Sequence, residues 1–529
     1  MQTNPYDATP YQSYAYGASH PSRLAVVASL FGLQAVALET AQVLEIGCAS
    51  GGNLLPMAAS LPGARFVGLD YSPVQIDLAL KAKAELGLTN IEFHCVDLRC
   101  AYTLGLGTFD YVIAHGIYSW LPPDAQAALL ALCQDSLAPQ GIAYVSYNTL
   151  PGWRMRGIIR EMMLFHAELF PDPGQKVVQA KALLNFMAQQ VPTENNPYGQ
   201  YLRHELKLVS AVSDSYLSHD HLEEHNEALY FRDFMARANA AGLAYLGEAD
   251  FSSMVGAGVS NAAYQQLAGE VKDIIRLEQY LDFMRNRTFR MTLLVRQGSE
   301  IKRNVTGDRL QNLWVSSALK PATACDTATM DETSFQSASG HGLRTGHQIT
   351  KAALLVLQEQ FPGALAFKEL LGLARSRLPS SWCDAVSTRQ DATTLGSDLL
   401  LGYMAPGTLQ LYAGAPGAVV TPGNSPLASA YARWQARTAQ VVTNLRHETV
   451  EISAIARFLL PLLDGRHDLA TLRDQLRIAL AEGTVQLEHG GQVDPSEAAG
   501  LALQETLNLV LKSLAADGLL QHPDTKRTA

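Results

Sequence analysis

Short apolar runs alternate with helical segments between Gln42 and Asn148, and this alternation restricts the fold more than any other feature. We expect five strands, QVLEIG, ARFVGLD, NIEFHCVD, FDYVIAHG and IAYVSYN, at residues 42–47, 64–70, 90–97, 109–116 and 142–148. The segment after the second strand has helical periodicity, with Ser72 as N-cap and Pro73 in the first turn. Strands this apolar, separated by helices, form a parallel sheet that is covered on both faces. Ligands of such sheets bind beyond the carboxyl ends of the strands, so we expect a site at that edge.

The first strand runs into a glycine-rich loop, EIGCASGGN, at residues 45–53. Glycines there let the backbone approach a ligand, and the N-terminus of the next helix offers free N–H groups to an anion. A dinucleotide fingerprint has glycine where this chain has Ala49, so a pyrophosphate would fit less well. Glu45 lies two positions before the first glycine, where a carboxylate can help to bind an amino-acid group.

Two further acidic residues end the second and third strands. Asp70 can accept hydrogen bonds from both hydroxyls of a ribose, and Asp97, followed by Leu98, stands where an adenine amine could be held. Together with Glu45, these residues place carboxylates at three successive strand ends. This pattern suits a cationic adenosine ligand that carries an amino acid, and S-adenosylmethionine is such a ligand.

Four motifs, VLEIGCASGGN, GLDYSP, VDL and FDYVIAHG, resemble in order and spacing the cofactor motifs of class I S-adenosylmethionine-dependent methyltransferases. The alternative is a Rossmann-like fold that binds another ligand. The resemblance implies S-adenosylmethionine as cofactor. It implies cofactor contacts from Glu45, Gly47, Cys48, Gly51, Asn53, Asp70, Tyr71, Asp97, Leu98 and His115.

The layout of the whole chain resembles bacterial methyltransferases that carry a methyltransferase regulatory domain, among them lysine methyltransferases of outer-membrane proteins. The stretches SHPSRLAVVASLFGL, HGIYSWLPP, VSYNTLPGWRMRG, YFRDFMARANAAGLAYLGE and LLPLLDGRHDLATL carry this resemblance. We therefore expect an α/β fold with a Rossmann-like, seven-stranded methyltransferase core. The expected segments are a core with an N-terminal lid arm at 1–170, a helical insertion (the regulatory or middle domain) at 171–230, a return to the core sheet at 231–300, and two C-terminal lobes at 301–400 and 425–520. Helix–turn–helix patterns make these lobes mainly helical and winged-helix-like.

The exit from the fourth strand, AHGIYSWLPP, places polar and aromatic side chains at the expected site. Methyl transfer to a lysine needs a neutral amine, which a dry aromatic slot or a base can provide. The candidate catalytic residues are His115, Tyr118, Trp120 and Tyr147, with Asn148 and Trp153 as further wall residues and Tyr6, Tyr11, Tyr14 and Tyr16 as a lid. His115 is either a general base or a backbone contact of the cofactor whose ring only packs, and the sequence leaves both open.

The net charge of −10 argues against a general nucleic-acid binder and suits a lysine-bearing protein partner. The resemblance points to an outer-membrane or surface protein as that substrate. The six cysteines show no C-x-x-C spacing, and no stretch is long and apolar enough to span a bilayer, so we expect a cytoplasmic protein without membrane insertion. A homodimer is compatible with the sequence, which leaves the oligomeric state open.

HLEEH, at residues 221–225, matches the H-x-x-E-H zinc pattern literally. It lies in the expected insertion, no third ligand is evident, and the methyltransferase motifs explain the chain without a metal. We therefore expect no metal site.

The expected function is S-adenosylmethionine-dependent N-methylation of lysine side chains in a protein. Two alternatives remain. A small-molecule N- or O-methyltransferase would give His115 a clearer role as a base, and a catalytically silent module would bind the cofactor without turnover.

Overall fold

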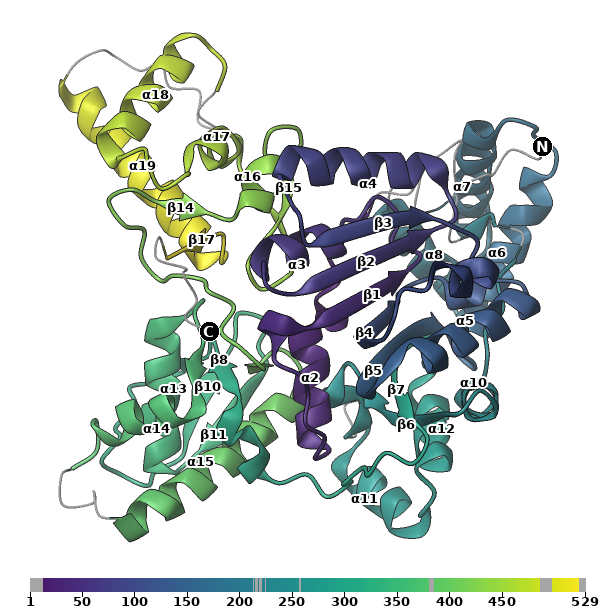
Figure 1. The fold of residues 1–529 in the computed structure, drawn as a ribbon, viewed down its shortest axis with the longest axis horizontal. Helices are drawn as coiled ribbons and strands as arrows, with labels where there is room; N and C mark the ends of the chain where they lie inside the picture. Colours follow the sequence, from purple (N-terminus) through teal and green to yellow (C-terminus); the bar gives the residue numbers. More distant parts are fainter. Residues whose placement is uncertain are drawn as a thin grey trace.

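A seven-stranded sheet forms the centre of the molecule (Figure 1). The computed structural model describes residues 13–522 except 213, 215–216, 218–220, 224, 256–257, 380–384 and 486–496. The strand order is β3-β2-β1-β4-β5-β7-β6. The strands are β1 (Gln42–Ile46), β2 (Arg65–Asp70), β3 (Ile91–Cys95), β4 (Phe109–Ala114), β5 (Leu137–Asn148), β6 (Leu243–Glu248) and β7 (Phe289–Arg296).

The first five strands are parallel, whereas β7 runs antiparallel to both of its neighbours, β5 and β6. Strand order reverses between β1 and β4, so their carboxyl ends form the edge where a ligand is expected. Because β7 is antiparallel, its first residue lies at this same edge, with Phe289 opposite Asn148 of β5. The seven-stranded, Rossmann-like prediction is confirmed.

Helices pack against the sheet and bring their N-termini toward the carboxyl ends of the strands. They include α2 (Pro21–Leu30), α3 (Leu54–Ser60), α4 (Pro73–Leu86), α5 (Pro123–Ser136) and α10 (Phe231–Ala240). The predicted start of α4 is confirmed: the Ser72 hydroxyl accepts a hydrogen bond from the Gln75 N–H at 3.2 Å. The helix ends at Gly87, which adopts the left-handed conformation that favours glycine.

The segment between β5 and β6 forms a helical unit with a small core of its own. It contains α6 (Trp153–Ala167), α7 (Pro173–Gln190) and α8 (Pro197–Ser210), whose buried faces meet at residues such as Ile159, Leu184 and Leu202. The chain then returns through α10 to β6. Two further helices, α11 (Asn261–Glu270) and α12 (Ile274–Arg285), lead to β7.

A buried ion cluster anchors β7. Arg290 has no exposed side-chain surface and donates to Glu248 at 2.6 Å, Glu278 at 3.1 Å and Asp282 at 2.9 Å. Its guanidinium also lies 3.8 Å from the ring centroid of Phe231. Since Arg290 follows Phe289, this cluster fixes the end of β7 that meets the site edge.

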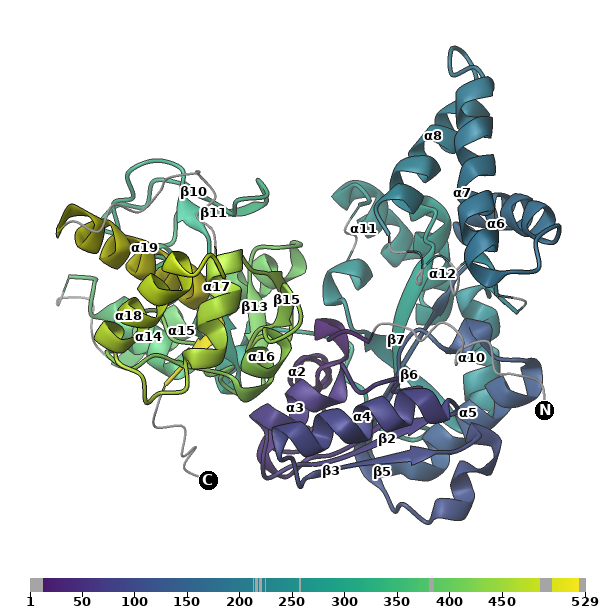
Figure 2. The ribbon, with the colours of Figure 1, turned by 90° about the horizontal axis from the view of Figure 1, so that it is seen from above.

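Two C-terminal lobes lie at the opposite end of the molecule from α6–α8 (Figure 2). The first contains α13 (Gln348–Gln360), α14 (Phe367–Arg375) and α15 (Ala385–Met404), and its core is continuous with that of the sheet. The second has a separate core and contains α16 (Ala430–Gln435), the hairpin β15 (Val441–Thr443) and β16 (Thr449–Glu451), α17 (Ala454–Leu459), α18 (Leu469–Ala481) and α19 (Glu497–Ala516). Within the described residues, no helix is both long and apolar enough to cross a membrane.

Candidate functional site

A cavity of about 620 Å³ opens at the carboxyl ends of β1 to β4. It is lined by Ser13 and Tyr16, by the glycine loop, by the ends of β2 and β3, and by the segment after β4. Its further walls come from Asn148, Trp153, Arg156 and Phe289. Of the ten cofactor residues predicted from the sequence, nine line this cavity: Glu45, Gly47, Cys48, Asn53, Asp70, Tyr71, Asp97, Leu98 and His115.

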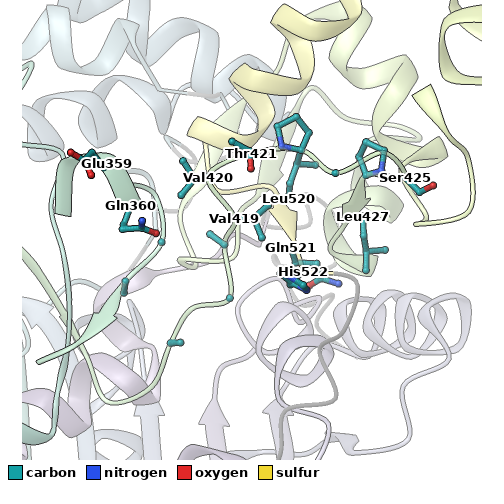
Figure 3. Close-up of a pocket in the computed structure, with 18 residues that line it drawn as sticks. Glu359, Gln360, Val419, Val420, Thr421, Ser425, Leu427, Leu520, Gln521 and His522 are labelled. Atoms are coloured by element: carbon teal, nitrogen blue, oxygen red, sulfur yellow. The ribbon is translucent and has the colours of Figure 1, made fainter. Parts of the chain in front are cut away.

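Another cavity, of about 810 Å³, lies between the two C-terminal lobes (Figure 3). Its walls include Gln360, Val419, Leu427, Leu520 and His522. Glu359 is the one acidic residue among its lining residues, and no residue of the seven-stranded sheet lines it. The smaller cavity at the sheet edge, with its three strand-end carboxylates, is therefore the candidate site.

Asp70 organises the glycine loop. Its carboxylate accepts hydrogen bonds from the backbone N–H groups of Ala49 at 2.8 Å and of Ser72 at 2.9 Å. Ala49 has a φ of +46°, in the left-handed region, so the loop has the bend of a glycine at that position. Asp70 also lines the cavity, so its carboxylate is accessible to a ligand.

Glu45 and Asn53 form a buried pair at the start of the loop. The Asn53 side-chain amide donates to Glu45 Oε1 at 2.8 Å. Burial raises the pKa of Glu45 to about 8, with a contribution from the negative charge of Asp70. The other carboxylate oxygen, Glu45 Oε2, has no hydrogen-bond partner among the described residues. An unsatisfied buried acceptor of this kind fits a ligand that brings its own donor.

Asp97 is engaged by a neighbouring arginine. Its carboxylate accepts from the backbone N–H of Arg99 at 2.9 Å and from the guanidinium Nε of the same residue at 2.9 Å. The Arg99 hydrogen bond lowers the pKa of Asp97. Arg99 also reaches Asp124 on α5 at 3.0 Å. A ligand amine at Asp97 would share a carboxylate that is already ionised and bound to an arginine.

His115, directly after β4, also lines the cavity. Its Nδ1 is 2.8 Å from the hydroxyl of Tyr144 and 3.4 Å from that of Ser146, while the Ser146 hydroxyl accepts from the N–H of Gly116 at 2.7 Å. The ring of Tyr16 stacks on the imidazole. Burial lowers the pKa of His115 to about 4. The imidazole is therefore neutral near pH 7 and a weak base.

The cavity wall beyond His115 is aromatic. It is formed by Trp120 after β4, Trp153 at the start of α6 and Phe289 at the start of β7. Arg156 lies next to Trp153, with its guanidinium 5.7 Å from the ring centroid. Aromatic faces of this kind pack against apolar chains and attract cationic groups.

Three predicted site residues do not line the cavity. Tyr118 and Tyr147 are almost fully buried in an aromatic cluster with Phe234, and the ring centroids of Tyr147 and Phe234 are 4.0 Å apart. The Tyr147 hydroxyl lies 3.1 Å from that of Thr292, behind the site. Gly51 has a φ of +79°, and a Cβ there would lie 2.8 Å from Phe93. Its position serves the packing of the loop on β3.

Several lining residues were not anticipated from the sequence, namely Ser13, Gln75, Arg99, Ile117, Arg156 and Phe289. For Phe289 a signal was present. An antiparallel strand begins at the edge where its parallel neighbour ends, so the apolar run FRMTLLV, which starts at Phe289, brings this residue to the site edge. Tyr16 of the proposed lid does line the cavity, whereas Tyr6 and Tyr11 lie outside the described residues.

His221 of the HLEEH stretch is buried, which lowers the pKa of its imidazole to about 4. Glu224 in the same stretch lies outside the described residues. In the described part of the chain, no three histidine, cysteine, aspartate or glutamate side chains are grouped so as to hold a metal ion.

Three family models match the chain. They are described as a methyltransferase domain, at residues 43–141, a predicted methyltransferase regulatory domain, at 213–296, and the C-terminal winged helix domain of PKMT, at 424–519. The third match confirms the winged-helix prediction for the second C-terminal lobe. The second spans β6 and β7, so the segment matched as regulatory contributes two strands to the central sheet.

Similar proteins cover nearly the whole chain. An uncharacterised protein of Rickettsia prowazekii is 34% identical over 529 residues, covering 98% of this chain and 94% of its own length. The solved structure of PKMT2 from Rickettsia typhi has a TM-score of 0.85 and 30% identity, and it covers 97% of this chain and 100% of that one. A second structure of PKMT2, in complex with AdoHcy (S-adenosylhomocysteine), matches equally well.

AdoHcy is what remains of S-adenosylmethionine after methyl transfer, and the methyltransferase match includes the glycine loop and the ends of β2, β3 and β4. The cofactor expected from the strand-end acids is thereby confirmed as S-adenosylmethionine. The chain belongs to the family of class I S-adenosylmethionine-dependent methyltransferases that carry a methyltransferase regulatory domain.

Proposed function

We propose that this enzyme methylates the side-chain nitrogen of lysine in a protein substrate. The observation that carries the proposal is the wall of Trp120, Trp153 and Phe289, which shares one cavity with the strand-end carboxylates. The name of the similar Rickettsia typhi protein, PKMT, a protein lysine methyltransferase, supports the same substrate class.

The residues present fit the cofactor. Glu45 Oε2, which is buried and unpartnered among the described residues, would accept from the amino group of the methionine part. Asp70 would accept from the ribose hydroxyls, while Asp97 and Leu98 would flank the adenine. When bound, S-adenosylmethionine supplies an electrophilic methyl group on a positively charged sulfur.

The surrounding side chains of this protein then have two tasks, to orient the amine and to exclude water from it. A lysine with its usual pKa of about 10.4 cannot pass its proton to His115. With a pKa of about 4 for the imidazole, the transfer would be uphill by about 9 kcal/mol. We therefore assign neutralisation of the lysine to burial in the aromatic slot, which lowers the pKa of an amine.

This weak basicity also disfavours the alternative of a small hydroxyl-bearing acceptor. An alcohol has a far higher pKa than an ammonium ion and depends more strongly on a base in the site. A neutral His115 held by Tyr144 acts instead as a rigid wall that carries the stacked ring of Tyr16.

The direct test is incubation of the purified enzyme with methyl-labelled S-adenosylmethionine, host lysate and candidate outer-membrane or surface proteins. Mass spectrometry of the products should find methyl groups on lysine. The matched control is Asp70→Ala, which should give no transfer. Label confined to the small-molecule fraction would overturn the substrate class, and tight cofactor binding without any transfer would support the silent module.

We also propose that the enzyme acts in the cytoplasm, where its substrate would be modified before export. The five cysteines in the described residues form no disulfide, as expected in a reducing compartment. Cell fractionation with an antibody against the enzyme tests this location. The oligomeric state, for which a homodimer stays a prediction, is measured by light scattering.

A further inference from the structure

A turn of the C-terminal winged-helix domain reaches into the methyltransferase core beside the glycine loop. The turn joins β15 to β16, and it carries His447, which is 4% exposed. The imidazole Nε2 lies 2.8 Å from Oδ1 of Asn53. The two residues are 394 positions apart in the sequence.

The direction of this hydrogen bond follows from the other partners of Asn53. The backbone N–H of Tyr16 can only donate, and it contacts the same Oδ1 at 2.9 Å. The oxygen end of the amide therefore faces His447, and Nε2 must be the donor. The nitrogen end of the amide donates to Glu45 Oε1. His447, Asn53 and Glu45 form a continuous chain that ends at the carboxylate proposed to bind the cofactor amine.

The turn itself is held rigidly by its own domain. Asn444 Oδ1 accepts from the backbone N–H groups of Arg446 and Glu448, both at 2.9 Å. The Asn444 side-chain amide donates to the carbonyl of Asp517 at 2.9 Å, close to the end of α19. His447 has a φ of +62°, in the left-handed region that few non-glycine residues adopt, and these hydrogen bonds around it hold the backbone there. The imidazole is thus presented to Asn53 from a fixed position.

We propose that His447 is a positioning residue for cofactor binding and that the C-terminal winged-helix domain completes the cofactor site. By donating to Asn53, His447 fixes the amide that orients Glu45. This inference rests on the proposed contact between Glu45 and the cofactor amine. Binding of the cofactor and docking of the turn are then thermodynamically linked, so each strengthens the other.

The first test measures the affinity for S-adenosylhomocysteine by calorimetry in full-length variants with wild-type circular dichroism. His447→Leu should bind about 10-fold more weakly, since a buried acceptor loses a donor. His447→Gln, which keeps a donor at similar reach, should recover most of this affinity. The matched control is Trp434→Phe. It removes a different hydrogen bond between this domain and the core, from the indole N–H to Glu85 at 2.7 Å, and should leave affinity unchanged.

Equal affinity in His447→Leu and wild type, or an equal loss in Trp434→Phe, would overturn the assignment. A companion variant, Glu45→Gln, separates the two proposals. If Glu45→Gln binds S-adenosylhomocysteine as tightly as wild type, the proposed contact between Glu45 and the cofactor amine is wrong. If Glu45→Gln binds weakly while His447→Leu binds as tightly as wild type, only the proposed role of His447 is wrong.

A second test needs no variant. Hydrogen exchange of the wild-type protein is followed with and without S-adenosylhomocysteine. Because binding and docking are linked, the amides of residues 443–449 should exchange more slowly with the ligand bound. Unchanged exchange in this turn, together with protection of the glycine loop, contradicts the inference.

Discussion

The ring of Tyr16 stacks on that of His115, with centroids 3.7 Å apart and an angle of 30° between the ring planes. The phenol comes from the N-terminal segment and the imidazole from the end of β4. Their contact covers one face of the imidazole, and the Tyr144 hydroxyl occupies Nδ1. The imidazole is thus shielded on one face and at one of its two nitrogens.

This shielding predicts a stability difference with a defined sign. The pKa of His115 is about 4 in the folded protein, below the usual 6.5. The unfolded chain therefore binds more protons between these pH values, and its population grows as the pH falls. The histidine should contribute up to about 3 kcal/mol of stability above pH 6.5 that is lost toward pH 4. Urea unfolding of wild type and His115→Gln at several pH values measures this difference, and parallel pH profiles would contradict it.

Glu45 should make cofactor affinity dependent on pH. With its pKa raised to about 8 by burial, the carboxyl is protonated at neutral pH in the free protein. An ammonium ligand requires the ionised form, so binding releases a proton. Affinity for S-adenosylhomocysteine should therefore rise between pH 6 and 7.5, by up to about tenfold per pH unit. Calorimetry in two buffers of different ionisation enthalpy detects the proton. Glu45→Gln should lose the slope, and Glu39→Gln, at an exposed position, should keep it.

Asp70→Ala removes the acceptor of the Ala49 and Ser72 N–H groups and the proposed ribose contact. We expect binding of S-adenosylhomocysteine to weaken by at least about 100-fold. The control is Asp77→Ala, on the exposed side of α4. Unchanged affinity in the Asp70 variant would contradict the proposed contact between Asp70 and the ribose.

Phe289→Ala and Trp120→Ala test the acceptor side of the cavity. Each removes an aromatic wall that is not among the proposed cofactor contacts, so kcat/KM for the proposed protein acceptor should fall about 10-fold while cofactor affinity stays within twofold. Phe165→Ala, at a 76% exposed position on α6, is the comparison. A parallel loss of cofactor affinity would place these rings on the cofactor instead.

Arg290→Met should be strongly destabilising. It leaves the carboxylates of Glu248, Glu278 and Asp282 buried without the arginine that touches all three. We expect a loss of about 3–5 kcal/mol in the free energy of unfolding, since an uncompensated buried charge is costly. Chemical denaturation measures it. A loss below about 1 kcal/mol would show that Arg287, which also pairs with Glu248 and Asp282, supports the cluster alone.

Much of the sheet could be predicted because its apolar strands are short and end in glycine or acidic residues. The strand-end carboxylates Glu45, Asp70 and Asp97 reached the cavity for the same reason: parallel strands deliver their ends to one edge. Which residues of β5 face the cavity was harder to foresee. Side chains alternate along a strand, and Ser146 and Asn148 point to the site whereas Tyr147 packs on Phe234. Tyr147 was predicted as a site residue because of its residue type alone.

Nothing in the sequence indicated that His447 would contact the cofactor site. Its contact with Asn53 depends on how an entire domain docks, and no local pattern near either residue encodes that arrangement. The same holds for Arg156, which enters the cavity only because α6 leaves the sheet edge at Trp153. Hydrophobic periodicity and helix-capping rules describe local structure, so they do not predict contacts that depend on tertiary packing.

The pairing of β5 with β7 also sets an order of events during synthesis. Residues 149–288 separate the two strands, so β5 leaves the ribosome well before its partner exists. Until then the nascent sheet has an open hydrogen-bonding edge, which is the kind of edge that invites aggregation. The intervening helices can meanwhile form their own small core from local contacts. A chaperone that shields the β5 edge would therefore act during the translation of this middle segment, before Phe289 arrives to close the wall of the cavity.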